Sequence, residues 1–132
     1  MDPSLPEQDQ IWLSATQPAE ELSVVHVGGE LDMLTAPTLT EFLARALASR
    51  PRNLIIDITE VTFLGSSGLR ALLDGQHLAG EATRVALAVT PRSAALRSLE
   101  VSRLLELFKH FPTAGEAMAA LADHSVKREH PV

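Results

Sequence analysis

The sequence predicts an α/β fold with a mixed, mostly parallel sheet of about five strands, about four helices and an opening β-hairpin. Three observations lead to this prediction. Strand-like apolar segments alternate with helical stripes, the central strand segments are near-continuous apolar runs, and no repeat or low-complexity linker divides the chain. Strands that alternate with helices are typical of a parallel sheet with right-handed crossovers. The 132 residues, 45% of them apolar, suit one domain with a single core.

Each element is assigned from the spacing of its apolar residues. Apolar residues that alternate or run together predict strands, and apolar residues that recur every three or four positions predict helices. The predicted strands span residues 11–15, 22–27, 54–58, 85–89 and 107–111. The predicted helices begin at residue 35 or 36, after residue 68, at residue 91 and after residue 113. The first two strands form the hairpin, with its turn at residues 18–21.

Residues with special backbone or capping chemistry mark the ends of these elements. The pair Gly28-Gly29 is expected to end the second strand, and Pro37 fits the first turn of the first helix. Thr90 is predicted to cap the third helix. Thr113 and Glu116 have the spacing of a capping box at the start of the last helix.

The domain is expected to span residues 11–122, between a flexible N-terminal arm and a flexible C-terminal tail at residues 123–132. Residues 1–10 are acidic and contain two prolines, which does not fit a signal peptide. No run of about 18 apolar residues is present, so no insertion into a membrane is expected.

The charge of the chain restricts the partners that it is expected to bind. The formal net charge is −6, which opposes binding to nucleic acid or to an anionic membrane, because both require a positive face. Acidic residues are concentrated before Arg45, either for solubility alone or as an acidic face for a basic partner. The absence of cysteine excludes disulfides and thiol chemistry and is compatible with a cytoplasmic protein.

The sequence contains no pattern for catalysis or for binding a cofactor or metal. Ser66 and Ser67 lie directly between Gly65 and Gly68, whereas a nucleophile elbow requires Gly-x-Ser-x-Gly. Neither a phosphate-binding loop with lysine nor a dinucleotide-binding glycine motif is present. The five histidines show no metal-ligand spacing. We therefore expect no enzyme activity, no cofactor and no metal.

The most informative segment is Phe63–Leu69, in which two hydroxyl groups follow a buried strand and open an apolar helix. The free N–H groups and the positive dipole end of a helix N-terminus would hold a phosphate placed there. One interpretation is that Ser66 or Ser67 only caps the helix. The other is that one of the two serines also accepts a phosphoryl group, which adds about −1.5 to −2 charges to the surface.

Two motifs, in this order and spacing, resemble those of a known family. Residues 57–69, with the sequence DITEVTFLGSSGL, look like the signature of STAS domains of the anti-sigma factor antagonist type. The earlier segment 28–32, GGELD, resembles the second motif of that family. The resemblance covers the chain from about residue 11 to residue 122 in matching element order.

The resemblance implies a regulatory binding protein that acts in a partner switch controlling transcription. Such proteins bind an anti-sigma factor that is also a serine kinase, and this binding frees the sigma factor. The kinase inactivates the antagonist by phosphorylating a serine, and a phosphatase restores it. The position of the motif assigns the phosphorylated residue to Ser66, with Ser67 as the second choice. The residues expected to contact the partner are Glu30, Asp32, Gly65, Ser66, Ser67, Gly68 and Leu69.

Two positions depart from the family pattern. The family usually has Asp where this chain has Gly65, so a carboxylate that would contact the kinase and repel a new phosphate is missing. The family tends to have Gly at Arg103, where a positive φ would strain an arginine.

The partner surface is expected to be convex, with little pocket volume. The alternative function is a STAS domain that binds a small ligand or serves as an accessory module of a transport complex.

Overall fold

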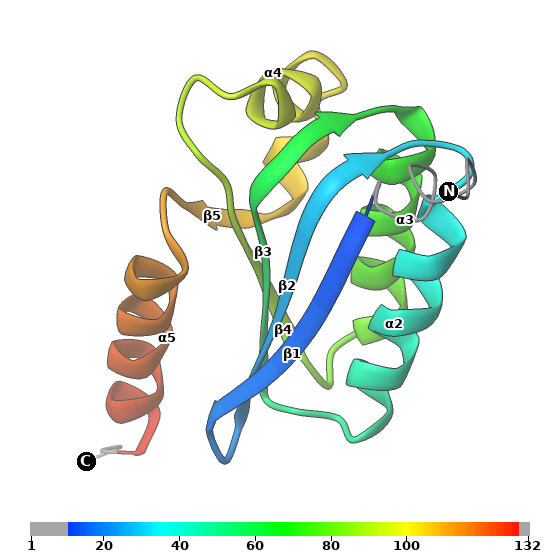
Figure 1. Cartoon of the computed structure of the whole chain (residues 1–132). Coiled ribbons are helices and arrows are strands. Elements are labelled where there is room, and N and C mark those ends of the chain that lie inside the picture. Colours follow the sequence, from blue (N-terminus) through cyan, green and yellow to red (C-terminus); the bar gives the residue numbers. More distant parts are fainter. Residues whose placement is uncertain (1–10, 130–132) are drawn as a thin grey trace, which may run out of the picture.

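A five-stranded sheet organises the computed structural model of the chain, which describes residues 11–129 (Figure 1). The strands are β1 (Ile11–Ala19), β2 (Leu22–Leu31), β3 (Asn53–Leu64), β4 (Arg84–Ala88) and β5 (Lys109–Phe111). The helices are α2 (Ala36–Ala48), α3 (Ser66–Ala79), α4 (Ala94–Val101) and α5 (Ala114–Glu129), with the 3-10 helix η1 (Leu104–Leu107) before β5. The predicted α/β fold is therefore confirmed.

The strands follow one another across the sheet in the order of the sequence. β1 pairs with β2 in the antiparallel direction, which confirms the opening hairpin. The pairs from β2 to β5 are all parallel. Because parallel strands end at the same edge of a sheet, the segments that lead into α2, α3 and α4 lie near one another at the carboxyl end (Figure 1).

The helices cover the two faces of the sheet unequally (Figure 1). α2 and α3 pack on one face over the larger core, in which Leu31, Ile56 and Leu72 are fully buried. α5 alone covers part of the opposite face, over a smaller core that includes Ile55 and Leu121. α4 lies at the carboxyl end of the strands. The surface at this end is therefore formed by loops, by the starts of α2 and α3, and by α4.

β2 runs through its two glycines to Leu31, so the prediction that the glycines end this strand is wrong. The indole of Trp12, on the neighbouring strand, lies over Gly28, where a Cβ atom would overlap the ring. Gly29 has a φ of 96° beside a shift in the β2–β3 register, a conformation that favours glycine. The glycine pair makes room for the indole and for an irregularity inside the strand.

The first turn of α3 packs closely against the ends of β2 and β3. A Cβ atom at Gly68 would lie 2.7 Å from both Leu31 Cβ and Leu64 Cδ1, which is too close for any side chain. The Gly65 N–H group also donates a hydrogen bond to the Leu31 carbonyl at 2.9 Å. The missing side chain at Gly68 therefore allows the start of the helix to rest on the sheet.

The start of α4 differs from the sequence prediction. The helix begins at Ala94, and Ser93 is its N-cap, because Ser93 Oγ accepts the Leu96 N–H at 3.1 Å. Arg92 lies between Thr90 and this cap, and its φ of 63° is not a helical conformation. Thr90 is therefore not the cap. The segment between Thr90 and Ser93 forms a turn and not the first turn of α4.

The last helix shows the Thr113 half of the predicted capping box and is longer than predicted. Thr113 Oγ1 accepts the Glu116 N–H at 3.0 Å. α5 continues to Glu129, so residues 123–129, which the sequence predicts to be part of a flexible C-terminal tail, are helical. The predicted N-terminal arm at residues 1–10 and the final residues 130–132 lie outside the described residues.

Gly68→Ala is expected to lower the stability of the fold. Overpacking a core costs about 1–3 kcal/mol, which exceeds the gain of about 1 kcal/mol that alanine brings to a helix interior. Calorimetric unfolding should therefore give a lower melting temperature. Gly115→Ala is the matched control, since the nearest atom to a Cβ there is Thr113 Oγ1 at 3.9 Å. An unchanged melting temperature for Gly68→Ala would contradict the close packing of α3.

Arg103→Gly is expected to raise stability by up to about 1 kcal/mol. Arg103 lies between α4 and η1 with a φ of 67°, which glycine adopts without steric cost. Its ion pair with Glu106, at 3.3 Å between exposed side chains, contributes little. The midpoint of urea unfolding should rise. The same change at Arg97, in the middle of α4, should lower it, and a lower midpoint for Arg103→Gly would contradict the expected strain.

Candidate functional site

The predicted site residues meet at the carboxyl ends of β2 and β3. Leu31 and Leu64 are partners in the β2–β3 register, and each is followed directly by a predicted site residue, Asp32 and Gly65. The chain then enters α2 after Asp32 and α3 after Gly65. Two motifs that are far apart in the sequence therefore form one surface at this end of the sheet.

The two serines lie in the first turn of α3. The N-cap is Gly65, with Ser66 and Ser67 as the first two helical residues, and the cap position has no side-chain hydrogen bond. The interpretation that a serine caps the helix is therefore wrong. Ser66 is exposed, whereas Ser67 is half-buried. Among the described residues, neither hydroxyl group has a hydrogen-bond partner, so the Ser66 hydroxyl is accessible for modification or for contact with a partner.

The remaining predicted contact residues differ in accessibility. Glu30 is exposed, Gly65 and Leu69 are half-buried, and Gly68 is buried beneath the helix start. The contribution of Gly68 is therefore to the position of α3. Glu30, Ser66 and part of Leu69 remain available to another molecule.

Asp32 organises the loop that leads into α2. Asp32 Oδ1 accepts the N–H groups of Leu34 at 3.0 Å and Thr35 at 3.1 Å. Thr35 Oγ1 in turn accepts the Asp32 N–H at 2.9 Å and donates to the Glu30 carbonyl at 2.7 Å. The half-buried Asp32 carboxylate is thus used within the chain, which the sequence motif alone did not indicate.

Two open cavities flank the serines, in contrast to the expected convex surface with little pocket volume. One, of about 420 Å³, is lined by Met33, Ala36, Pro37, Ser66, Ser67 and Arg70. The other, of about 460 Å³, is lined by Phe63, Leu64, Leu69, Ala94, Arg97, Ser98, Val101 and Ser102. We call the second the α4 groove.

Exposed apolar side chains surround these cavities. Met33 is 76% exposed, Leu34 is 77%, Phe63 is 51% and Val101 is 79%. None of these four side chains is among the predicted contact residues, because their exposure depends on tertiary packing. For Met33 and Leu34, the sequence does contain one indication of exposure, since both lie between a predicted strand and a predicted helix. Such clustered exposure at one end of a molecule is typical of a protein-binding surface.

A polar cluster on the sheet lies away from the serines. His26 Nδ1 is 3.0 Å from Asp57 Oδ2, and His26 Nε2 is 3.4 Å from Thr16 Oγ1. Asp57 Oδ1 accepts the N–H and hydroxyl groups of Thr59 at 3.0 and 2.7 Å. The first residue of the 57–69 motif therefore joins neighbouring strands and takes no part in the site.

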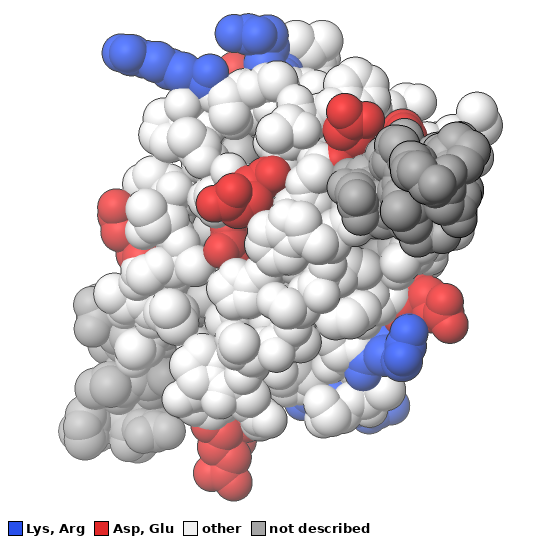
Figure 2. All heavy atoms as spheres, viewed as in Figure 1, with Lys and Arg blue, Asp and Glu red and all other residues white. Residues whose placement is uncertain are grey.

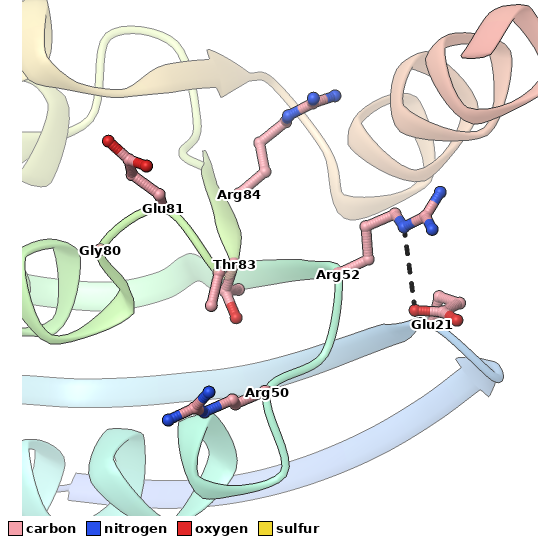
Figure 3. A pocket seen from close by; sticks show the side chains of 8 residues that line it. Glu21, Arg50, Arg52, Gly80, Glu81, Thr83 and Arg84 are labelled. Atoms are coloured by element: carbon pink, nitrogen blue, oxygen red, sulfur yellow. Dashed lines mark ion pairs between the residues drawn. The ribbon is translucent and has the colours of Figure 1, made fainter.

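The opposite end of the sheet carries a cavity of about 580 Å³ with three arginines (Figure 3). Arg52 lies 3.9 Å from Glu21, and Arg50 points away from both Arg52 and Arg84 (Figure 3). The guanidinium groups do not converge on one position, so their arrangement does not define an anion site.

Within the described residues, no group of His, Asp and Glu is arranged to hold a metal ion. No helix between residues 11 and 129 has the length and apolar character needed to cross a membrane. On the face shown in Figure 2, acidic side chains are spread over the described surface and basic ones lie at its margins.

Comparisons with known proteins identify the family. Residues 14–117 match the STAS domain family, and the chain belongs to this family. The anti-sigma-F factor antagonist RsfB of Mycobacterium tuberculosis is 30% identical over 107 residues, which cover 81% of this chain and 87% of that protein.

Solved structures agree with this assignment. The crystal structure of an anti-sigma factor antagonist from Mycobacterium paratuberculosis is 33% identical, with a TM-score of 0.78 over 85% of this chain and 94% of that one. The unphosphorylated anti-sigma factor antagonist SpoIIAA is 18% identical, with a TM-score of 0.70 over 85% of this chain and 97% of that one, and so shares the fold.

Asp32→Ala is expected to lower stability by about 1 kcal/mol, as the loss of a helix cap does. The reason is that two N–H groups before α2 lose their acceptor. Asp32→Asn keeps an oxygen acceptor and removes the charge, so it should retain most of the stability. Urea unfolding of both variants would measure this difference. Equal stability of Asp32→Ala and the unsubstituted protein would contradict the structural role of the carboxylate.

Proposed function

We propose that this protein is an anti-sigma factor antagonist, which binds an anti-sigma factor and thereby frees a sigma factor for transcription. The observation that carries the proposal is the exposed Ser66 at the start of α3, between two cavities bordered by exposed apolar side chains. Such a surface suits a protein partner and contains a hydroxyl group that a kinase can reach. The antagonists at 30% and 33% identity support the same function.

The partner in this proposal is an anti-sigma factor with serine-kinase activity, which phosphorylates Ser66, and a phosphatase reverses the modification. The protein acts in the cytoplasm as a binding module and not as an enzyme. A phosphate adds about −1.5 to −2 charges at the docking surface. Two like unit charges about 4 Å apart repel by about 1 kcal/mol in water and about 4 kcal/mol at an effective dielectric constant of 20. A phosphate on Ser66 that faces an acidic group of the partner therefore weakens binding, and the protein does not need to unfold.

Two features of the start of α3 favour a phosphate on Ser66. Ser66 is the first helical residue, so a phosphate there lies near the positive end of the helix dipole. Arg70, one turn further along the helix, lines the same cavity as Ser66. Its ion pair with Asp74, at 3.3 Å, is exposed and therefore weak, which leaves the guanidinium able to turn toward the phosphate.

Ser66→Glu is expected to weaken binding to a purified anti-sigma factor kinase by about 10-fold or more, because a carboxylate is placed where the phosphate would be. The melting temperature should be unchanged or slightly higher, since a negative charge at a helix N-terminus is stabilising by about 0.3–1 kcal/mol. Titration calorimetry and thermal unfolding would measure the two effects separately.

Ser66→Ala and Ser67→Ala are the controls for modification. After incubation with the kinase and ATP, intact-mass measurement should show one added phosphate on the unsubstituted protein and on Ser67→Ala, and none on Ser66→Ala. Equal affinities for Ser66→Glu and the unsubstituted protein would reject phosphorylation as the switch. No binding of the unsubstituted protein to any anti-sigma factor of its own cell would reject the proposed function.

A further inference from the structure

The α4 groove has the composition of a site for an apolar anchor. Its lining is mainly apolar, and Arg97 is the charged residue among those that line it. The cavity of about 460 Å³ falls within the range of about 300–1,000 Å³ that is typical of binding pockets. It lies between the end of β3, the first turn of α3 and the outer surface of α4.

Phe63 joins this groove to the serine site. A Cβ atom at Gly65 would lie 3.0 and 3.3 Å from Phe63 Cε2 and Cζ, so the ring rests against the N-cap of α3. Glycine at position 65 leaves the space that the ring occupies. Phe63 is nevertheless 51% exposed, which leaves much of the aromatic side chain for contact with another molecule. An exposed aromatic side chain beside a cavity is a frequent centre of binding energy in protein interfaces.

The position of the groove favours a protein segment as its occupant. Leu69 lines the groove and lies one turn after Ser66 in the same helix, so a partner that covers Ser66 extends directly over the groove. Val101, 79% exposed, forms the far side and is accessible to the same partner. The surface of Ser66 and the surface of the groove are therefore continuous.

The charge at the groove indicates which partner residue binds there. Arg97 makes no ion pair with the side chains described for residues 11–122, although this chain has a net charge of −6. An unpaired guanidinium at the border of an apolar cavity favours a neighbouring carboxylate on the partner. A partner segment with an apolar side chain next to Asp or Glu would match both the apolar lining of the groove and the charge of Arg97.

We propose that the α4 groove binds an apolar anchor side chain of the anti-sigma factor, with a carboxylate beside it that pairs with Arg97. This inference rests on the proposed function and extends its contact surface from α3 to α4. Phe63, Leu69 and Val101 enclose the anchor, and Arg97 selects the residue next to it. The groove thereby helps to determine which anti-sigma factor is bound, independently of the phosphate on Ser66.

The test is titration calorimetry of the purified anti-sigma factor with Val101→Asp and Arg97→Glu. Both positions are on the exposed side of α4, so the variants should fold, which thermal unfolding would verify. Each variant should bind about 10-fold or more weakly than the unsubstituted protein. Leu78→Asp is the matched control, because Leu78 is 59% exposed at the opposite end of α3, and it should bind normally.

Other outcomes separate the two proposals. Unchanged affinity of Val101→Asp and Arg97→Glu would overturn the role of the groove, while binding by the unsubstituted protein and its loss in Ser66→Glu would still support the proposed function. No binding by any form would overturn both. Sedimentation of the protein alone should show a monomer, and a dimer that Val101→Asp dissociates would assign the groove to a second copy and overturn the proposal.

Discussion

The close contact between the first turn of α3 and the ends of β2 and β3 determines how the site is built. A side chain at Gly68 would overlap Leu31 and Leu64, and the Gly65 N–H group is bonded to the Leu31 carbonyl. This contact holds the start of α3 beside the loop of Asp32. The serines therefore have a fixed position although their own hydroxyl groups have no partner among the described residues. The packing lies beneath the surface, and the surface itself remains free for binding.

The order and type of the elements could be predicted from the sequence because the apolar spacing changes clearly between strands and helices. Several boundaries could not, since they depend on contacts between distant segments. The glycines of β2 resemble a strand end, yet Gly28 lies under the indole of Trp12 inside the strand. Thr90 resembles a helix cap as closely as Ser93 does, and the backbone turn at Arg92 decides between them. Local residue preferences are weak evidence for an element boundary, because tertiary contacts can override them.

The candidate site was predicted in part. The motif containing Ser66 placed a hydroxyl group at a helix start, and the structure has that residue exposed. The side chains that frame it were not predicted, because Phe63 and Val101 continue apolar patterns that usually mean burial. Asp32 was predicted as a partner contact and also proves to hold its own loop. Whether an apolar residue is covered depends on the number and length of the helices around it, which spacing does not give.

The placement of Trp12 over Gly28 has a practical consequence. The chain contains one tryptophan and no tyrosine, so its near-ultraviolet emission originates almost entirely from a single indole. Trp12 is 48% exposed, and it lies on the strand pair that leads to Glu30 and the loop before α2. Trp12 is thus an intrinsic fluorophore close to the docking end of the molecule. Complex formation can be followed by titration of its fluorescence, without any attached dye.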